Sequence, residues 1–317
     1  MNARRRTPLW CRGRLLLLVV ALPLCGGRCA RVPPPPPPEP DGERAFRHLE
    51  AQVEFGARVP GSAAMLRCRE YLLRELARHT DHVRVQSFSM LDPYGPDSLH
   101  LANLMAHFHP DRAARVLLAA HYDSRPRADR DSGAAAELPV PGANDGASGV
   151  AALLEVAEAL ARWDPGIGVD IVFFDGEDYG ASGDLDFYLL GSRYFASTMG
   201  SYRPRAVLVL DMVGDRNLRI PMEGYSLMRS PDLVRLVFSV ADSLQAPGFV
   251  AAPGDTVYDD HIPFLERGIQ AVDLIDFDYP PWHTRGDLPQ ECSAASLESV
   301  TRVVLHVLWR LGAATGP

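Results

Sequence analysis

The stretch VDIVFFDGEDYG, residues 169–180, opens with six mostly apolar residues, β-branched or aromatic, and closes with a glycine among three acids. The opening run has the length and composition of a central β-strand that is covered on both faces. Asp175, Glu177 and Asp178 follow it at once, and their like charges repel one another and resist burial. This arrangement predicts a positively charged partner at the end of the strand.

Other segments extend the pattern along the chain. Short, almost continuously apolar runs suited to central strands lie at residues 116–120, 206–210 and 271–275, and residues 83–90 alternate with a period of two. Helical spacing of apolar residues occurs at residues 61–79, 147–163, 232–244 and 293–311, the last beginning with Ser293 as a helix cap. Strands alternating with helices predict an α/β fold, a three-layer α/β/α sandwich around a mixed, mostly parallel central sheet.

Length and composition limit the class of protein. The chain has 317 residues, of which 47% are hydrophobic and 23% charged, so it can bury a substantial core. Its formal net charge of -8 gives no electrostatic reason to expect nucleic acid, because phosphate binding favours a basic surface. We expect a signal peptide at residues 1–29, a proline-rich linker at 30–41, a single catalytic domain at 42–312 and a tail at 313–317.

The amino-terminal segment has the layout of a secretory signal. Five arginines precede an apolar run at residues 15–25, and small residues follow it. The run is 11 residues long, whereas roughly 20 are needed to span a bilayer. A cleaved signal and a secreted, periplasmic or otherwise extracytoplasmic protein are therefore favoured over a signal-anchor or a lipoprotein modified at Cys25 or Cys29. Cleavage would bring the net charge from -8 to -14, because this segment holds six arginines and no acid.

Only two of the five cysteines, Cys68 and Cys292, lie in the body of the chain. They are widely separated and show no CxxC spacing typical of zinc sites. A disulfide and two buried free thiols are both compatible with this pattern, and we favour free thiols.

Each of the four apolar runs is followed by groups that can bind metal ions. His121, Asp175, Asp211 and His283 follow the four apolar runs, and Asp145 precedes the helix predicted at residues 147–163. Alone, each has an ordinary structural explanation, such as a helix cap or a turn. Together they would concentrate acids at one edge of the sheet without compensation. Carboxylates and imidazoles without a thiolate are typical of a catalytic zinc site.

These residues also carry a resemblance to a known family. The motifs in question are HYDS at 121–124, GANDGASG at 142–149, FFDGED at 173–178, LGSRYF at 190–195, LDMVGD at 210–215, DDHIPF at 259–264 and WHT at 282–284. In this order they resemble the zinc aminopeptidase superfamily of the peptidase M28 type, and most of all its glutaminyl-peptide cyclotransferase (glutaminyl cyclase) branch. The similarity covers residues 46–311 and implies a phosphorylase/hydrolase-like α/β/α sandwich.

The resemblance implies roles for particular residues. Asp145, Asp178 and His283 would bind one zinc ion, and Glu177 would be the general acid/base. His121 and Asp211 match the positions that, with Asp145, hold a second zinc in two-metal aminopeptidases. Asp211 and Asp260 would also support catalysis through hydrogen bonds, and Trp282 would contact the substrate.

The implied reaction is the conversion of N-terminal glutamine of peptides or proteins to pyroglutamate with release of ammonia. The alternative is an M28-type metalloaminopeptidase with one or two zinc ions. It stays open because Asp178 stands where animal cyclases usually have glutamate and Asn144 where they usually have threonine. A non-catalytic binding module on the same fold would need a damaged site, but Glu177 and the expected ligands are present. We expect a monomer that acts on peptide N-termini and binds no nucleic acid.

One charged segment, DSRPRADRD at residues 123–131, lies next to the first of these motifs. Its mixed charges predict a solvated loop near the mouth of the site rather than a clamp on the substrate.

Overall fold

The computed structural model describes residues 34–314 of the chain. All elements named below lie within one compact unit. The predicted export signal lies outside the described residues, so its cleavage or lipidation stays a prediction.

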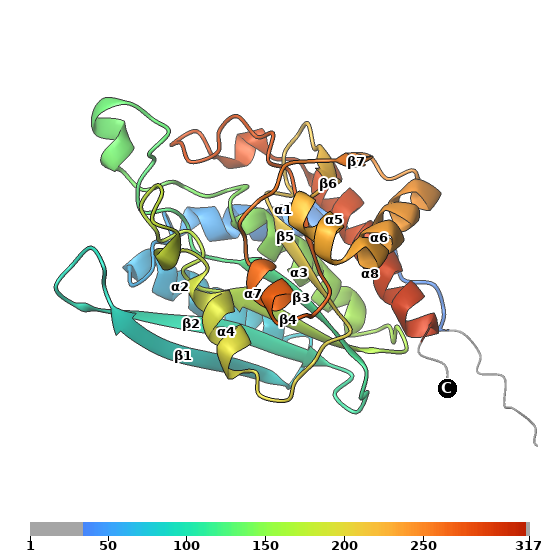
Figure 1. Cartoon of the computed structure of the whole chain (residues 1–317). Helices are drawn as coiled ribbons and strands as arrows, with labels where there is room; N and C mark the ends of the chain where they lie inside the picture. The colour runs from blue at the N-terminus through green and yellow to red at the C-terminus, as the bar shows by residue number, and fades with distance from the viewer. Residues whose placement is uncertain (1–33, 315–317) are drawn as a thin grey trace, which may run out of the picture. The chain divides into compact units, whose positions relative to one another are not determined.

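A six-stranded mixed sheet forms the centre of the described unit (Figure 1). Its strands, in spatial order, are β1 (Val83–Leu91), β2 (Ser98–Phe108), β4 (Gly168–Phe174), β3 (Arg115–His121), β5 (Ala206–Asp211) and β8 (Ala271–Ile275). The last four are parallel to one another, whereas β2 pairs antiparallel with β4 and β1 antiparallel with β2. A small parallel pair, β6 (Ile220–Met222) and β7 (Phe249–Pro253), lies apart from it. The mixed, mostly parallel sheet predicted from sequence is confirmed.

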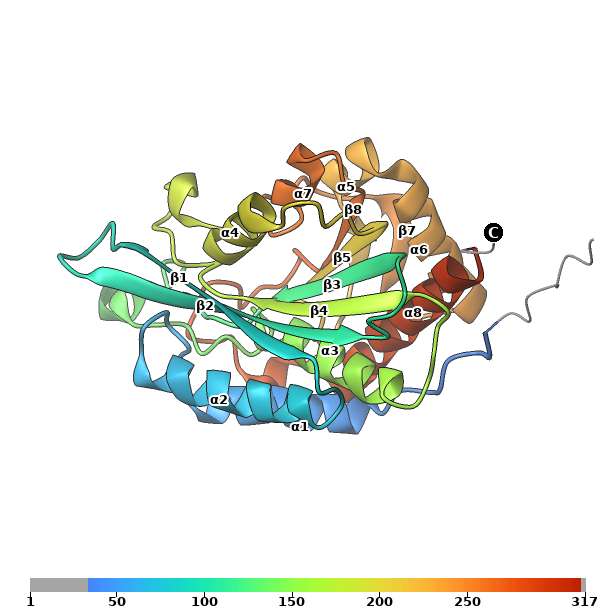
Figure 2. The same ribbon diagram turned by 90° about the horizontal axis from the view of Figure 1, so that it is seen from below.

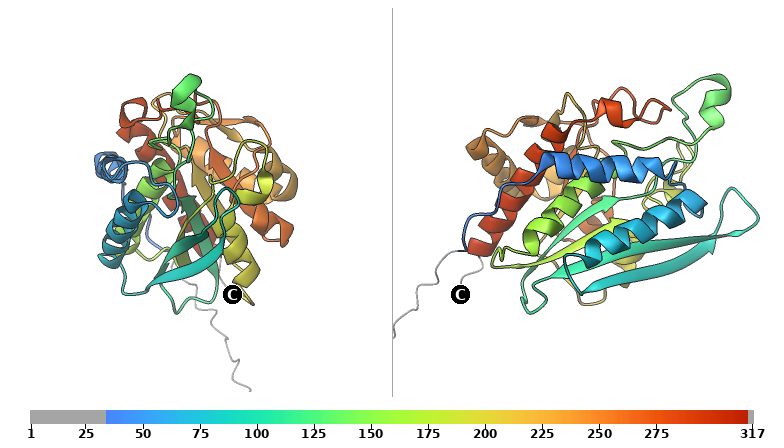
Figure 3. Two further views of the ribbon diagram at one scale, coloured as in Figure 1. Left: turned by 90° about the vertical axis from the view of Figure 1, so that its left-hand side faces the viewer. Right: turned by 180° about the vertical axis from the view of Figure 1, so that it is seen from behind.

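Helices cover both faces of this sheet, as the view from below and the end-on view show (Figures 2 and 3). One face carries α1 (Gly42–Glu54), α2 (Ala63–Ala77), α3 (Ala147–Leu160), α6 (Pro231–Leu244) and α8 (Ala294–Ala313). The other face carries α4 (Leu190–Thr198) and α7 (Ile262–Glu266), with α5 (Gly224–Arg229) beside β8. Short 3-10 helices lie at Gly133–Glu137, Leu185–Phe187 and Pro289–Glu291. Among the described residues, no helix is long and apolar enough to cross a membrane.

Strand β3 shows why the central runs are continuously apolar. Its residues Val116, Leu118 and Ala120 pack into the core below the sheet, with α3 and α8. The alternate residues Leu117 and Ala119 pack into the opposite core, with side chains of α4 and α7. Both faces are buried, and each fully buried Leu or Val side chain contributes roughly 1.5–3 kcal/mol. The continuously apolar sequence of β3 is therefore explained by burial of both faces of the strand.

Local capping sets the helix boundaries. The side chain of Asp41 accepts a hydrogen bond from the backbone amide of Arg44 at 2.9 Å, at the start of α1. Ser293 accepts one from the amide of Ser296 at 3.2 Å, at the start of α8, as the sequence predicts. Such caps pair backbone donors that the first turn of a helix leaves free.

The described end of the proline run contacts the folded body. The indole of Trp309 donates a hydrogen bond to the carbonyl of Pro34 at 2.8 Å, and that of Trp163 donates to Pro35 at 2.9 Å. Proline lacks a backbone donor but keeps its carbonyl acceptor. Composition alone predicts only a proline-rich linker, and these two contacts anchor Pro34 and Pro35 beside α3 and α8.

Both body cysteines, Cys68 and Cys292, are buried free thiols. Burial raises the pKa of Cys68 to about 11, so the unreactive thiol form is favoured there. The structure thus agrees with the favoured interpretation of free thiols.

Candidate active site

A small cavity of about 160 Å³ opens where the parallel strands end. Its walls are formed by Asp145, Glu177, Asp178, Tyr188, Asp211, Met212, Thr256, Val257, Tyr258, Asp259, Ile275, Phe277, Trp282 and His283. Six of the residues predicted from sequence are in this wall: Asp145, Glu177, Asp178, Asp211, Trp282 and His283. The carboxyl edge of a parallel sheet is where α/β proteins usually bind ligands.

On one side of this site, the backbone of Gly146 lies very close to the side chain of His121. Asp145 precedes α3, and Gly146 lies against the imidazole of His121, the last residue of β3. A Cβ atom at Gly146 would lie 2.4 Å from Nε2 of His121. Only glycine fits at that distance, and this explains why a glycine directly follows Asp145.

Two buried aspartates hold the loops that carry the acids. Asp123 accepts hydrogen bonds from the backbone amides of Glu177 and Asp178 at 3.1 and 3.2 Å. Asp287 in the same way accepts from the amides of Asn144 and Asp145 at 2.8 and 3.1 Å. Each carboxylate thereby fixes two consecutive residues of a loop. Sequence reasoning missed Asp287, because nothing in its neighbourhood marks it as different from a surface acid.

Asp145, Asp178 and His283 converge from three distant parts of the chain. Each offers a ligand atom within 4.8 Å of the others. Nε2 of His283 lies 3.5 Å from Oδ1 of Asp178 and 3.8 Å from Oδ2 of Asp145. The second oxygen of Asp178 is buried without a hydrogen-bond partner in the described structure. An unpaired buried carboxylate oxygen costs free energy unless a cation compensates it, so the three residues fit a zinc ion.

His121 forms a second group with Asp145 and Asp211. Its Nε2 atom lies 3.1 Å from an oxygen of each, and Nδ1 lies 3.4 Å from Asp123. Burial would lower the pKa of His121, but Asp211, Asp123 and Asp145 outweigh it and raise that pKa well above its ordinary value. A protonated imidazole would compensate these carboxylates without an ion.

Glu177 is 8% exposed and lies beside Asp178 in the cavity wall. Burial raises the pKa of Glu177 well above its ordinary value, and the charges of Asp178 and Asp259 add to the shift. A carboxyl group with a raised pKa can hold a proton near neutral pH, which suits a general acid/base.

The two aspartates of the DDH motif take different positions. Asp259 lines the cavity with Asp211, whereas Asp260 is fully buried and is not among the lining residues. Burial, together with Asp259 and Asp145, raises the pKa of Asp211 to about 7, although His121 opposes the shift. The role assigned to Asp260 from sequence stays a prediction, and Asp259 is the acid of this pair that reaches the cavity.

Below Asp259 lies a further buried group with His261 and Asp273. Nε2 of His261 lies 3.2 Å from Oε2 of Glu223, and its Nδ1 lies 3.7 Å from Asp273. Glu223 also accepts backbone hydrogen bonds from Tyr225, Ser226 and Val257. Each ring nitrogen of His261 thus faces one acid, and of the three residues in this group only Asp259 lines the cavity.

Aromatic side chains form the mouth of the cavity. Trp282 packs on Phe277, with ring centroids 4.7 Å apart, and the guanidinium of Arg130 lies 4.5 Å from the indole centroid. Trp282 is partly exposed rather than a core residue. Its position in the wall is compatible with the substrate contact predicted from sequence.

The segment at residues 123–131 differs from the solvated loop predicted from its charges. The side chain of Arg125 is only 1% exposed, and it contacts Asp178 and Asp129. That prediction is wrong for Arg125, because charge pattern alone does not reveal that a buried acid lies opposite. Arg125 and Asp129 are site residues that sequence reasoning missed.

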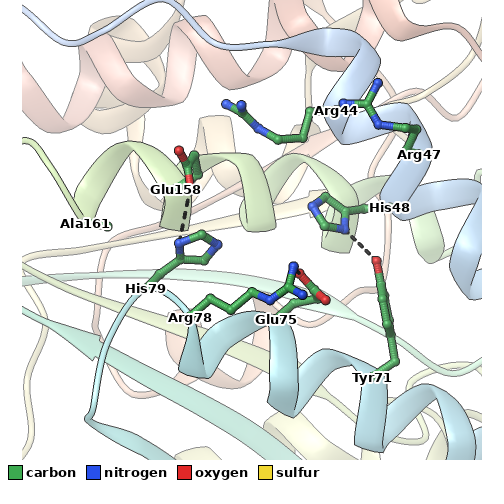
Figure 4. A pocket seen from close by; sticks show the side chains of 9 residues that line it. All are labelled: Arg44, Arg47, His48, Tyr71, Glu75, Arg78, His79, Glu158 and Ala161. Carbon is green, nitrogen blue, oxygen red and sulfur yellow. Dashed lines mark hydrogen bonds and ion pairs between the residues drawn. The ribbon is translucent and has the colours of Figure 1, made fainter.

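A larger cavity, of about 610 Å³, lies on the helical face between α1, α2 and α3 (Figure 4). Most of its charged and polar side chains are paired with one another or with a neighbour. His79 faces Glu158 at 3.3 Å, and His48 lies 2.6 Å from the hydroxyl of Tyr71 (Figure 4). Arg44 bonds to Glu155 and Arg78 to Glu75. The sequence places no catalytic motif there.

The chain has relatives of known sequence and structure. Residues 103–308 match the model of peptidase family M28. A glutaminyl-peptide cyclotransferase-like protein from Bos taurus is 31% identical over 280 residues, which cover 78% of this chain and 70% of that protein. Porphyromonas gingivalis glutaminyl cyclase has a TM-score of 0.82 at 33% identity, with 86% of this chain and 100% of that chain covered. A zinc-dependent exopeptidase from Parabacteroides distasonis has a TM-score of 0.81 at 34% identity, covering 86% and 99%.

Proposed function

The chain belongs to peptidase family M28, within its glutaminyl cyclase branch, and we therefore propose that it is a zinc-dependent glutaminyl-peptide cyclotransferase. Its substrates are peptides or proteins with an N-terminal glutamine, and its products are ammonia and the same chains with an N-terminal pyroglutamate. The observation that carries this proposal is the position of Glu177 in a small aromatic-walled cavity beside Asp145, Asp178 and His283.

Asp145, Asp178 and His283 would hold the zinc ion, and the ion, when bound, supplies Lewis acidity to the γ-carbonyl of the substrate glutamine. Glu177 accepts a proton from the α-amine as that nitrogen forms a bond to the γ-carbonyl carbon. The bond from the same carbon to the amide nitrogen then breaks. Glu177 gives the proton to that departing nitrogen, which leaves as ammonia. Its raised pKa suits both transfers.

Asp211 and Asp259 support this proton transfer through their position. Both line the cavity, and Asp259 is one of the charges that raise the pKa of Glu177. A group with a higher pKa holds the transferred proton longer, until the leaving nitrogen can accept it. The sequence also predicts that Asp260 supports this proton transfer. Because Asp260 does not line the cavity, this role stays a prediction.

The attack is intramolecular, so the site has to fold the glutamine side chain back on its own amine and exclude water. A cavity of about 160 Å³ is suited to one side chain rather than to a length of peptide. Phe277, Trp282 and Ile275 supply apolar surface at its wall. These features favour cyclisation over hydrolysis of the peptide bond, because hydrolysis requires a water molecule to attack a carbonyl carbon.

His121, Asp145 and Asp211 are close enough together to hold a second ion, but the proposed cyclase reaction needs only one. Nε2 of His121 lies 3.1 Å from both Asp145 and Asp211, a separation at which a ring proton can bond to them directly. A two-metal aminopeptidase would need these three groups as ligands of a second ion. We expect about one zinc per chain in purified protein, measured by elemental analysis, and a value near two would favour the aminopeptidase.

A paired peptide assay tests the reaction. The purified protein is incubated with Gln-Ala-amide and with Leu-Ala-amide, and ammonia and free amino acid are both measured. We expect ammonia and a pyroglutamyl product from the glutamine peptide and no leucine release. Release of leucine without cyclisation would overturn the proposal in favour of the metalloaminopeptidase.

The place of action is proposed from sequence alone. The arginines and the short apolar run in residues 1–29 support export, and a secreted or periplasmic enzyme would meet peptide N-termini there. The single catalytic domain, the monomeric state and the absence of nucleic acid among its partners remain predictions of the same kind.

A further inference from the structure

The loop at residues 123–131 begins directly after His121 and Tyr122 with Asp123, which holds the amides of Glu177 and Asp178. It holds Arg125, Asp129 and Arg130, all of which contact residues of the zinc site or its aromatic mouth. Arg125 is fully enclosed, with a side chain only 1% exposed. A buried guanidinium requires nearby acceptors, and here they belong to the site.

The first contact is with Asp178, one of the proposed zinc ligands. Nη1 of Arg125 donates to Oδ1 of Asp178 at 2.5 Å, and the hydroxyl of Tyr188 accepts from Nη2 at 2.8 Å. The other oxygen of Asp178, Oδ2, remains without a hydrogen-bond partner. The guanidinium therefore fixes the carboxylate by one oxygen and leaves the other oxygen available to the ion.

The second contact joins the same arginine to Asp129. Nε and Nη2 of Arg125 donate to the two oxygens of Asp129 at 3.1 and 2.6 Å. This is the bidentate geometry in which arginine and carboxylate orient each other. Asp129 is about one quarter exposed, so it lies between the buried arginine and the outside.

Asp129 in turn reaches His283, the ligand from the other end of the chain. Its Oδ1 atom lies 3.4 Å from Nδ1 of His283, and the amide of Arg130 donates to the carbonyl of His283 at 3.2 Å. A proton held on Nδ1 leaves the lone pair of Nε2 directed toward Asp145 and Asp178. The backbone of His283 has φ +59°, a conformation that needs support from its surroundings.

We propose that Arg125 and Asp129 form a positioning pair that sets the orientation of Asp178 and the tautomer of His283 for zinc binding. The inference rests on the zinc site of the proposed function, but it concerns ion affinity rather than the reaction. Partners of this kind are usually worth about 10- to 100-fold in metal affinity. An ion pair that only stabilised the fold would change unfolding without changing the affinity of the folded protein for zinc.

The test measures zinc affinity by competition with a chromophoric chelator on the purified full chain. Asp129→Ala removes the acceptor for His283 and the two carboxylate oxygens that accept from Nε and Nη2 of Arg125, and we expect it to weaken zinc binding by about 10- to 100-fold. Asp129→Asn keeps one acceptor oxygen and should lie between Asp129→Ala and the wild type. Because Asp129 is on a partly exposed loop, both variants should fold.

A matched control and a second variant complete the experiment. Arg127→Ala removes another arginine of the same loop, one that lies over the ring of Tyr94 at 5.0 Å and touches no proposed ligand, and its zinc affinity should equal that of the wild type. Arg125→Lys keeps the charge but not the fork, so it should also weaken binding. Wild-type affinity in Asp129→Ala would overturn the inference, as would an equal loss in Arg127→Ala. Failure to cyclise glutamine peptides, with this order of affinities intact, would instead count against the proposed function alone.

Discussion

The two cavities of this molecule differ in charge as much as in size. The cavity at the strand ends has a volume of about 160 Å³, and the one between α1, α2 and α3 about 610 Å³. In the smaller cavity, Asp145, Glu177, Asp178, Asp211 and Asp259 come together with fewer positive groups than acids. In the larger one, Arg44 and Arg78 pair with glutamates, and His79 faces Glu158.

This difference shows that the site of chemistry is recognised by acids that lack enough positive partners, and not by the volume of the cavity. Charges that are paired on the surface of a protein are inexpensive and contribute little to stability. Acids brought together below the surface are costly unless an ion or a proton is bound there. The helical-face cavity therefore needs no ligand to explain its residues, whereas the strand-end cavity does.

The largest effect should come from removing the imidazole of the smaller cavity. His283→Ala takes away one of three protein ligands, so we expect loss of the bound zinc and of all turnover. His79→Ala, in the larger cavity, is the matched control and should keep both. Elemental analysis and the glutamine peptide assay measure the two outcomes. Zinc retained at the wild-type level in His283→Ala would show that the histidine is no ligand.

The second largest effect should come from replacing a glutamate by glutamine, which should change turnover in the smaller cavity and not in the larger one. Glu177→Gln removes the proton acceptor without changing its shape, and we expect turnover to fall by roughly 10²- to 10⁴-fold while zinc stays bound. Glu75→Gln, in the larger cavity, should leave turnover unchanged, since it breaks only a pair with the mostly exposed Arg78. A comparable loss of turnover in both variants would break the distinction between the two cavities.

The smallest effect should be a change in the pH dependence of the free energy of unfolding, caused by His48 of the larger cavity. Burial, aided by His79, Arg44 and other nearby cations, lowers the pKa of His48 to about 4 from an ordinary 6.5. The unfolded chain therefore binds the proton first, and the stability linked to neutral His48 is present above pH 6.5 and is lost as the pH falls toward 4.

His48→Gln tests this linkage. The free energy of unfolding of the wild type should fall by roughly 2–3 kcal/mol more than that of the variant between pH 7 and pH 4. Urea unfolding at several pH values measures the difference, and glutamine peptide turnover at pH 7 should not change. Parallel pH curves for the two proteins would show that His48 is not the group responsible.

The parts of the fold that the sequence predicts are those with local causes. The four central parallel strands and helices α2, α3, α6 and α8 lie within a few residues of the predicted ranges, because two-sided burial and helical spacing leave direct patterns. Strand β2 was not predicted, since its residues alternate in burial only in part. Its antiparallel place beside β4 depends on a partner distant in sequence, which no local pattern reveals.

The predicted site follows the same rule. Asp145, Glu177, Asp178, Asp211, Trp282 and His283 line the cavity, and each belongs to a motif at the end of a strand or the start of a helix. Which of Asp259 and Asp260 lines the cavity depends on the orientation of the turn before α7. The sequence around the two aspartates does not reveal that orientation. Arg125, Asp129 and Asp287 act through contacts with distant segments, so only the folded structure reveals them.

The different surroundings of the tryptophans have an optical consequence. Trp163 and Trp309 are held by proline carbonyls on the helical face, and Trp282 alone of the three described indoles stands at the cavity mouth. Their emission should form a constant background against which the fluorescence of Trp282 varies. Binding of a molecule in the site should then change the intensity and wavelength of Trp282 fluorescence, so that binding can be measured without a label.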